Sequence, residues 1–188
     1  MQYAVTNSDL YDPTIDNLTP FIKDSGIQAL HTTPQMAYDA GLITDTMIAE
    51  YKMYAVVRHP NVRAASAFQH TLRPASATAS RVKRMLKARG FEALPSIFRR
   101  PQMDWFTIND KQVVTPILYD NYNVEFTALY NSMGADITVE KKNVGSDRAV
   151  KAGEIFKDRE FAKLSKVYYA ADWKLYRMAK NTDFADRD

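Results

Sequence analysis

The clearest pattern in the chain is an apolar run that passes directly into a helix-forming stretch. Residues 53–57 read MYAVV without a polar interruption, which predicts a strand covered on both faces in a parallel sheet. His59 and Pro60 turn the chain, and Asn61 is a residue type that caps helices, so we expect a helix to follow. Arg58 therefore stands at the carboxyl end of the strand, where open α/β sheets bind their ligands.

Elsewhere the apolar spacing and the turn residues predict helices that alternate with short strands. The expected helices cover residues 33–40, 44–50, 81–89, 124–133 and 156–178. Thr33 is expected to cap the first of them, and Gly41 and Gly90 are expected to end the helices that precede them. The expected strands cover residues 1–6, 28–32 and 137–139, with a hairpin or extended pair formed by 104–108 and 112–119. This alternation predicts a compact three-layer α/β domain with a short central parallel sheet flanked by helices.

Length and composition bound the picture further. A chain of 188 residues with 46% hydrophobic residues fits one folded domain, within which residues 1–27 are an atypical N-terminal segment and 73–100 a basic, mobile insertion. There is no cysteine, and the three histidines lack metal-ligand spacing, so we expect no metal site. Neither a signal peptide nor a bilayer-spanning run is evident, which predicts a cytoplasmic protein without a membrane partner.

The net charge of +3 is unevenly distributed. Between residues 73 and 100, Glu92 is the single acidic residue against eight basic ones: Arg73, Arg81, Lys83, Arg84, Lys87, Arg89, Arg99 and Arg100. Such a segment is either a solvated helix face or a surface for an anionic partner. No recognisable nucleic-acid module accompanies it, so we do not expect a nucleic-acid partner.

The helix after Arg58 carries the candidate chemistry. Arg63, Ser66 and His70 follow at spacings of three and four residues, which places them on one polar stripe. An arginine, a hydroxyl and a helix N-terminus that converge form an anion site, most naturally for a phosphate. The alternative is that Arg58 pairs with a carboxylate at the end of its strand.

Five stretches of the chain resemble a known family in the family's own order. VVRHPNVRAASAF resembles the V-R-x-P-x-x-R-x-x-S-x-[FY] segment of the PAPS-dependent sulfotransferases, particularly the carbohydrate sulfotransferases. The other stretches are HTTPQMAYDAGLITDTMIAEYKMYAVVR, RPQMDWF (for R-P-Q-x-x-[FW]), KKNVGSDR (for N-x-S-x-R) and VYYAADWKLY (for Y-x-x-D-x-x-L-[FY]). The resemblance implies a sulfotransferase-like fold, related to that of the P-loop NTPases, and PAPS (3′-phosphoadenosine 5′-phosphosulfate) or its product PAP as the nucleotide.

The resemblance also implies roles for residues of the strand–helix segment. In the family, the arginine at the strand end and the serine eight residues later bind the 3′-phosphate of PAPS, and Arg58 and Ser66 match both in type and spacing. Arg63 matches a position that supports this segment. We therefore expect all three residues at the cofactor site.

Two further parts of the site follow from the resemblance. The N-x-S-x-R loop folds over the nucleotide, so Asn143, Ser146 and Arg148 are expected there. His31 falls near the catalytic base of the 2-O-sulfotransferase branch, and a histidine can accept a proton from a substrate hydroxyl near neutral pH. Equally, His31 could be a histidine hydrogen-bonded at the N-terminus of the next helix.

One family element has no counterpart in the sequence. The family begins with a P-K-[TS]-G-T-[TS] loop that cradles the 5′-phosphosulfate, whereas the present chain has no glycine before Gly26 and no lysine before Lys23. Two hypotheses therefore stand. The first is an enzyme that transfers the sulfuryl group of PAPS to a hydroxyl of a glycan or similar, anionic acceptor. The second is a non-catalytic remnant of the fold that serves as a structural or binding component of an assembly, such as a phage particle (virion), with protein partners.

Overall fold

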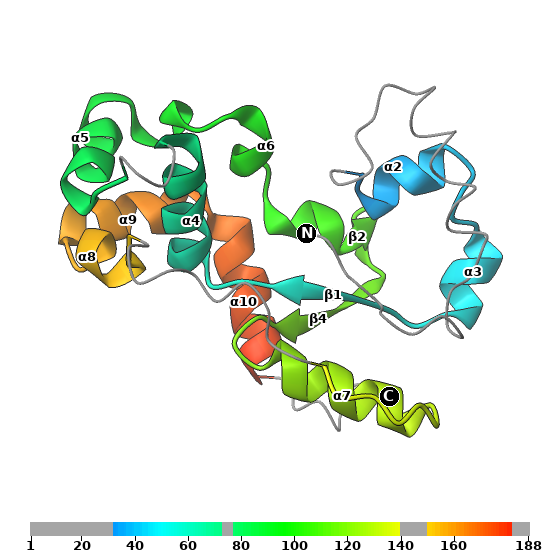
Figure 1. Ribbon diagram of the computed structural model, residues 1–188. Helices are drawn as coiled ribbons and strands as arrows, with labels where there is room; N and C mark the ends of the chain where they lie inside the picture. The colour runs from blue at the N-terminus through cyan, green and yellow to red at the C-terminus, as the bar shows by residue number, and fades with distance from the viewer. Residues whose placement is uncertain (1–31, 73–76, 140–149, 182–188) are drawn as a thin grey trace.

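The computed structural model describes residues 32–72, 77–139 and 150–181 of the chain (Figure 1). Over these residues the protein is mixed α/β and mostly helical, with a small parallel two-stranded sheet flanked by helices. The predicted strand at residues 1–6 and most of the one at 28–32 lie outside the described residues. In the part of the chain that is described, no helix is both long and apolar enough to cross a membrane.

The sheet consists of β1 (Met53–Val57) and β4 (Val114–Leu118), which run parallel. The apolar run is a strand of a parallel sheet, as predicted, but it is not covered on both faces as expected, since residues 53–56 are only half-buried and Val57 alone is buried. Pro116 lies opposite Ala55 in the register. Proline has no N–H to donate, and β4 tolerates it because each strand of this two-stranded sheet has one edge without a partner strand among the described residues.

Two short helices precede the sheet and begin where their caps predict. The side-chain oxygens of Thr33 and Thr44 each accept a hydrogen bond from a backbone N–H in the first turn, at 3.2 Å. Gly41, at φ +73, ends the first helix as the sequence predicts. The helices are α2 (Pro34–Asp39) and α3 (Asp45–Glu50).

A long crossover connects the two parallel strands, as parallel pairing requires. It comprises α4 (Pro60–Leu72), α5 (Ala79–Arg89), the 3-10 turn η4 (Gly90–Ala93), α6 (Ser96–Arg99), the 3-10 turn η5 (Gln102–Trp105), β2 (Thr107–Ile108) and β3 (Lys111–Gln112). Gly90 closes α5 at φ +57, as predicted. Residues 77–100, expected as part of a basic insertion, contribute Val82, Leu86, Phe91 and Leu94 to the main core.

The predicted pairing of residues 104–108 with 112–119 is only partly correct. β2 and β3 do form a hairpin around Asn109 and Asp110, which both adopt positive φ (49 and 61). Asparagine and aspartate tolerate that conformation in tight hairpin turns. The strongly apolar residues after Gln112 leave the hairpin and instead pair with β1, which buries Val114 and Ile117.

The C-terminal third differs most from the prediction. The expected helix over 156–178 is divided into two helices, and a third, shorter one ends at Phe156. Asp158 caps the first of the two by accepting a hydrogen bond from the Glu160 N–H. Residues 137–139 form no strand. The segment turns back along the helix that contains Thr127, and the Val139 N–H donates to the Thr127 hydroxyl. The helices are α7 (Tyr122–Ser132), α8 (Ala152–Phe156), α9 (Arg159–Tyr168) and α10 (Ala170–Asn181).

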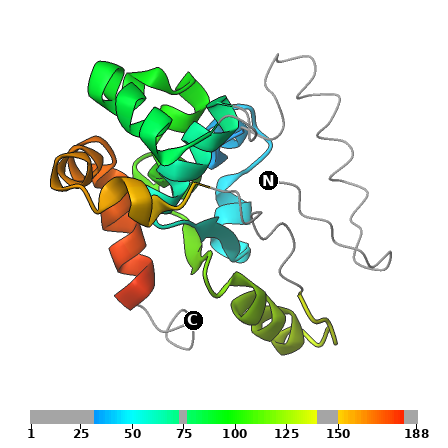
Figure 2. The same ribbon diagram turned by 60° about the vertical axis from the view of Figure 1, so that its left-hand side comes forward.

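Two apolar clusters hold these elements together. The larger one joins α4, α5, η4, α8 and α9, which form one group of helices in both views (Figures 1 and 2). The smaller one contains Val57, Phe106, Val114, Leu175 and Ala179, so α10 packs against the sheet. α7 has no buried residue and projects away from the large group of helices.

Leu175 tests the packing of α10 on the sheet. Its side chain is fully buried, so Leu175→Ala should lower the free energy of unfolding by about 2–5 kcal/mol in urea denaturation. Val167→Ala, on the exposed surface of α9, is the control and should change it by less than about 0.5 kcal/mol. Equal effects of the two substitutions would contradict this packing.

Candidate anion-binding site

The site begins where the ladder between the two parallel strands ends. The Tyr119 N–H donates to the Val57 carbonyl at 2.9 Å, which is the last bond of this ladder. Beyond it, the backbone of Arg58 finds its partners in one side chain. Gln102 accepts from the Arg58 N–H and donates to the Arg58 carbonyl, both at 2.9 Å. The carboxamide thus replaces a peptide unit of a neighbouring strand.

The Arg58 side chain is partly buried and lies over an aromatic ring. Its guanidinium carbon is 4.5 Å from the centre of the Tyr119 ring, which in turn stacks on Tyr122 at 5.6 Å. The Arg58 Nε is buried and has no hydrogen-bond partner among the described residues, nor does the guanidinium form an ion pair with any carboxylate there. A positive charge held this way is suited to an anion.

Helix α4 begins at Pro60, two residues after Arg58, and His59 rather than Asn61 provides the cap. The Nδ1 atom of His59 accepts a hydrogen bond from the Asn61 N–H at 3.2 Å, and the His59 carbonyl accepts from the Arg63 N–H at 3.0 Å. The Asn61 side chain is used differently, since it accepts a hydrogen bond from the Ser165 hydroxyl at 2.6 Å. The expected capping role of Asn61 is therefore wrong.

His59 is enclosed by aromatic residues of α10. Its ring meets the rings of Trp173 and Tyr176 edge-on, at 4.9 and 5.0 Å between centres. Burial lowers the pKa of His59, with a smaller opposing effect of Asp120. Because Nδ1 accepts a hydrogen bond, the proton of the neutral ring is on Nε2.

The Arg63 side chain reaches α10. Its Nη1 donates to the Asp172 carboxylate at 2.7 Å, its Nη2 donates to the Arg100 carbonyl, and its guanidinium lies over the Tyr169 ring. Only 16% of the Arg63 side chain is exposed. These partners occupy the guanidinium, so Arg63 supports the segment by joining α4 to α10.

Asp172 is the centre of this buried network. It is fully buried and accepts hydrogen bonds from Arg63 and from both N–H donors of Gln102, the backbone at 2.6 Å and the side chain at 3.3 Å. Burial raises the pKa of Asp172, whereas Arg63 and Gln102 act to lower it. Since all three partners donate, the ionised carboxylate is the form that matches them.

Of the other predicted site residues, the described part of the chain contains only Ser66. Ser66 is exposed on α4, two turns after the start of the helix. His31, Asn143, Ser146 and Arg148 lie outside the described residues. No group of three or more potential metal ligands occurs in the ranges that are described.

Three residues at the site had no role in the sequence analysis: Gln102, Tyr119 and Asp172. The signal for two of them was present, since Gln102 belongs to the R-P-Q stretch and Asp172 to the Y-x-x-D stretch. Nothing in the sequence marked Tyr119 apart from the chain's other tyrosines. Its role follows from the parallel pairing of β4 with β1, which sets it beside Arg58.

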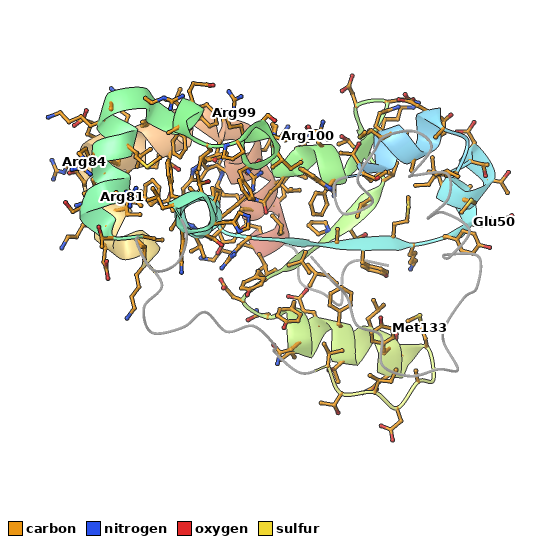
Figure 3. All side chains as sticks on the ribbon, turned by 45° about the horizontal axis from the view of Figure 1, so that its top comes forward. Glu50, Arg81, Arg84, Arg99, Arg100 and Met133 are labelled. Atoms are coloured by element: carbon orange, nitrogen blue, oxygen red, sulfur yellow. The ribbon has the colours of Figure 1, made fainter. Side chains whose placement is uncertain are left out.

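The basic segment divides into two parts in three dimensions. Figure 3 shows Arg81 and Arg84 on α5 at one end of the molecule, with Arg99 and Arg100 farther along. Arg99 pairs with Glu92, and the Arg100 Nε lies 3.8 Å from the Asp104 carboxylate. Of the described basic residues in this segment, Arg99 and Arg100 therefore each lie beside a carboxylate.

Comparisons of the chain with protein-family models, with curated proteins and with solved structures found no match. The residues and contacts themselves thus carry the functional argument.

The buried network can be tested at Asp172. Asp172→Asn removes the negative charge opposite Arg63 and should lower the free energy of unfolding by about 3–5 kcal/mol, because it leaves a largely buried cation without its counterion. Asp104→Asn is the matched control in a more exposed pair and should cost at most about 1 kcal/mol. Similar losses in urea denaturation would show that the Asp172 pair contributes no more than a surface pair.

His59 gives a pH-dependent prediction. Its pKa is lower in the folded protein than the ordinary 6.5, so the unfolded chain binds a proton first as the pH falls. Stability present at pH 7 should therefore decline below about pH 6.5. His59→Asn keeps a capping oxygen without titrating, and its free energy of unfolding should fall less between pH 7 and 5. An unchanged decline in the variant would assign the effect to other groups.

Proposed function

We propose that this protein is a sulfotransferase-like, nucleotide-binding domain that transfers the sulfuryl group of PAPS to a hydroxyl of a glycan or similar acceptor. One observation carries the proposal. Three stretches that resemble the family, far apart in the sequence, are joined by a single network of hydrogen bonds. Arg58 and Arg63 come from the first stretch, Gln102 from the second and Asp172 from the third.

The described residues suit the phosphate end of such a nucleotide. The Arg58 guanidinium has a buried Nε without a described partner, and Ser66 offers an exposed hydroxyl from the helix that follows. The positive end of the α4 dipole favours an anion at the same place. Arg58 and Ser66 would hold the 3′-phosphate, with Arg63 as a support.

PAPS would supply the activated sulfuryl group, and the protein would bind and orient it. The sulfotransferase-type arrangement, a three-layer relative of the P-loop fold, is supported by the β1–α4 unit and by the parallel pairing of β1 with β4. Asn143, Ser146 and Arg148 as a covering loop, and His31 as the base that accepts the acceptor's proton, complete the proposal from the family resemblance.

A specific observation favours a second candidate, a non-catalytic binding or structural component. The chain lacks the glycines and the lysine of the phosphosulfate loop in its first 22 residues. Such a protein could hold the 3′-phosphate of a nucleotide without activating the sulfuryl group. Release of PAP from PAPS in the presence of glycan acceptors would support the enzyme. Nucleotide binding without release would support the second candidate.

Calorimetric titration with adenosine 3′,5′-bisphosphate tests the shared part of both candidates. We expect binding that AMP does not reproduce, because AMP lacks the 3′-phosphate. Arg58→Ala should weaken it about 10- to 100-fold, since it removes a charge-assisted contact of roughly 1.5–3 kcal/mol. Arg84→Ala, an exposed arginine on α5, is the control and should bind like the wild type. Equal affinity for AMP, or an unaffected Arg58→Ala variant, would contradict the assignment.

A further inference from the structure

We infer that Gln102 is a positioning residue of the anion site, which holds the Arg58 guanidinium in place by fixing the Arg58 backbone. This inference rests on the proposed function for its meaning in nucleotide binding, although the contacts themselves do not depend on it. The observation is the double hydrogen bond of one carboxamide with both backbone groups of Arg58, at 2.9 Å each.

The position of Arg58 in the sheet explains why such a clamp is needed. Arg58 follows the last residue of β1, so its N–H and carbonyl lie beyond the ladder that β4 provides. Backbone groups that are buried without partners cost free energy, and a free loop would leave them to water. Gln102 supplies a donor and an acceptor in the spacing of a peptide unit and so satisfies both backbone groups of Arg58 as a neighbouring strand would.

Gln102 is itself held by Asp172 through its backbone and its side chain. Its side chain is largely buried, its backbone N–H donates to Asp172 at 2.6 Å, and its Nε2 lies 3.3 Å from the same carboxylate. Arg63 donates to the Asp172 Oδ2 atom at 2.7 Å, the same oxygen that the Gln102 Nε2 contacts. The chain of contacts therefore runs from α4 through α10 to η5 and back to Arg58.

The two Gln102 hydrogen bonds fix the backbone of Arg58, and the Tyr119 ring contacts the guanidinium at the end of its side chain. Fixing the backbone sets the direction of the Cα–Cβ bond. The guanidinium carbon lies 4.5 Å from the centre of the ring of Tyr119, the residue after β4. The Arg58 Nε forms no hydrogen bond with the described residues, so such a bond does not hold the side chain in place. Loss of the clamp should therefore loosen the guanidinium even when the fold persists.

The first experiment uses the ligand-free, full-length protein and does not depend on nucleotide binding. The Nε–H signal of Arg58 is observed by ¹⁵N NMR and assigned by its disappearance in Arg58→Lys. In the wild type its heteronuclear NOE should be close to that of the rigid backbone. Gln102→Met, which keeps the length of the side chain but removes both hydrogen bonds, should lower this NOE and shift the signal.

The matched control is Gln35→Met. Gln35 also binds a backbone N–H through its carboxamide, that of Asn109 at 2.6 Å, but this contact joins α2 to the hairpin. It should lower thermal stability without changing the Arg58 signal. A Gln102→Met protein with a wild-type Arg58 signal, or the same change in Gln35→Met, would overturn the positioning role.

A second variant guards against loss of folding in Gln102→Met. Gln102→Asn keeps the carboxamide and adds no charge beside Asp172, but its side chain is one CH₂ shorter and should weaken both bonds to the Arg58 backbone, so a smaller change of the Arg58 signal is expected. If this folded variant leaves the signal unchanged, the inference is wrong.

Titration with adenosine 3′,5′-bisphosphate then separates this inference from the proposed function. Gln102→Met should weaken binding about 5- to 10-fold in the wild-type background and have no further effect in Arg58→Ala, because it acts through Arg58. Equal losses in both backgrounds would overturn the positioning role. If the wild type binds no nucleotide but the Arg58 signal responds as expected, the proposed function fails and the positioning role stands.

Discussion

The arrangement of this protein depends on a buried carboxylate. Asp172 is fully buried, and a charge in that position is tolerated only when donors surround it. The donors come from α4, through Arg63, and from η5, through Gln102. Helix α10 also packs on the sheet through Leu175. The same helix therefore buries apolar surface and, through Asp172, holds Arg63 and Gln102. Packing and site geometry are thus set by one element.

Arg58, which precedes α4, and Arg63, which belongs to it, therefore have different roles. Arg63 is neutralised by Asp172 and joins helices, whereas Arg58 lies on the Tyr119 ring without a described counterion. Its Nε stays without a described partner. A charge that the described residues hold in place but do not neutralise is the feature expected of an anion-binding residue, and it is the physical basis for proposing a nucleotide phosphate there.

Local patterns in the sequence predict much of this fold, but not the contacts between distant segments. The caps at Thr33 and Thr44, the glycine stops, and the apolar run of β1 were all predictable, because each depends on a few adjacent residues. The break between α9 and α10 at Tyr169 was not, since the apolar spacing continues through it. For the site, Arg58 was identified by its place at a strand end. The partners of Arg58, Gln102 and Tyr119, depend on how the crossover returns β4 beside β1, which one sequence does not reveal.

The most direct test of this account is a crystal structure of the protein with adenosine 3′,5′-bisphosphate. The account predicts the 3′-phosphate within hydrogen-bond distance of the Arg58 guanidinium and the Ser66 hydroxyl, with Gln102 still bound to the Arg58 backbone. A nucleotide bound elsewhere, or an Arg58 side chain that remains on Tyr119 without contact to the phosphate, would contradict it.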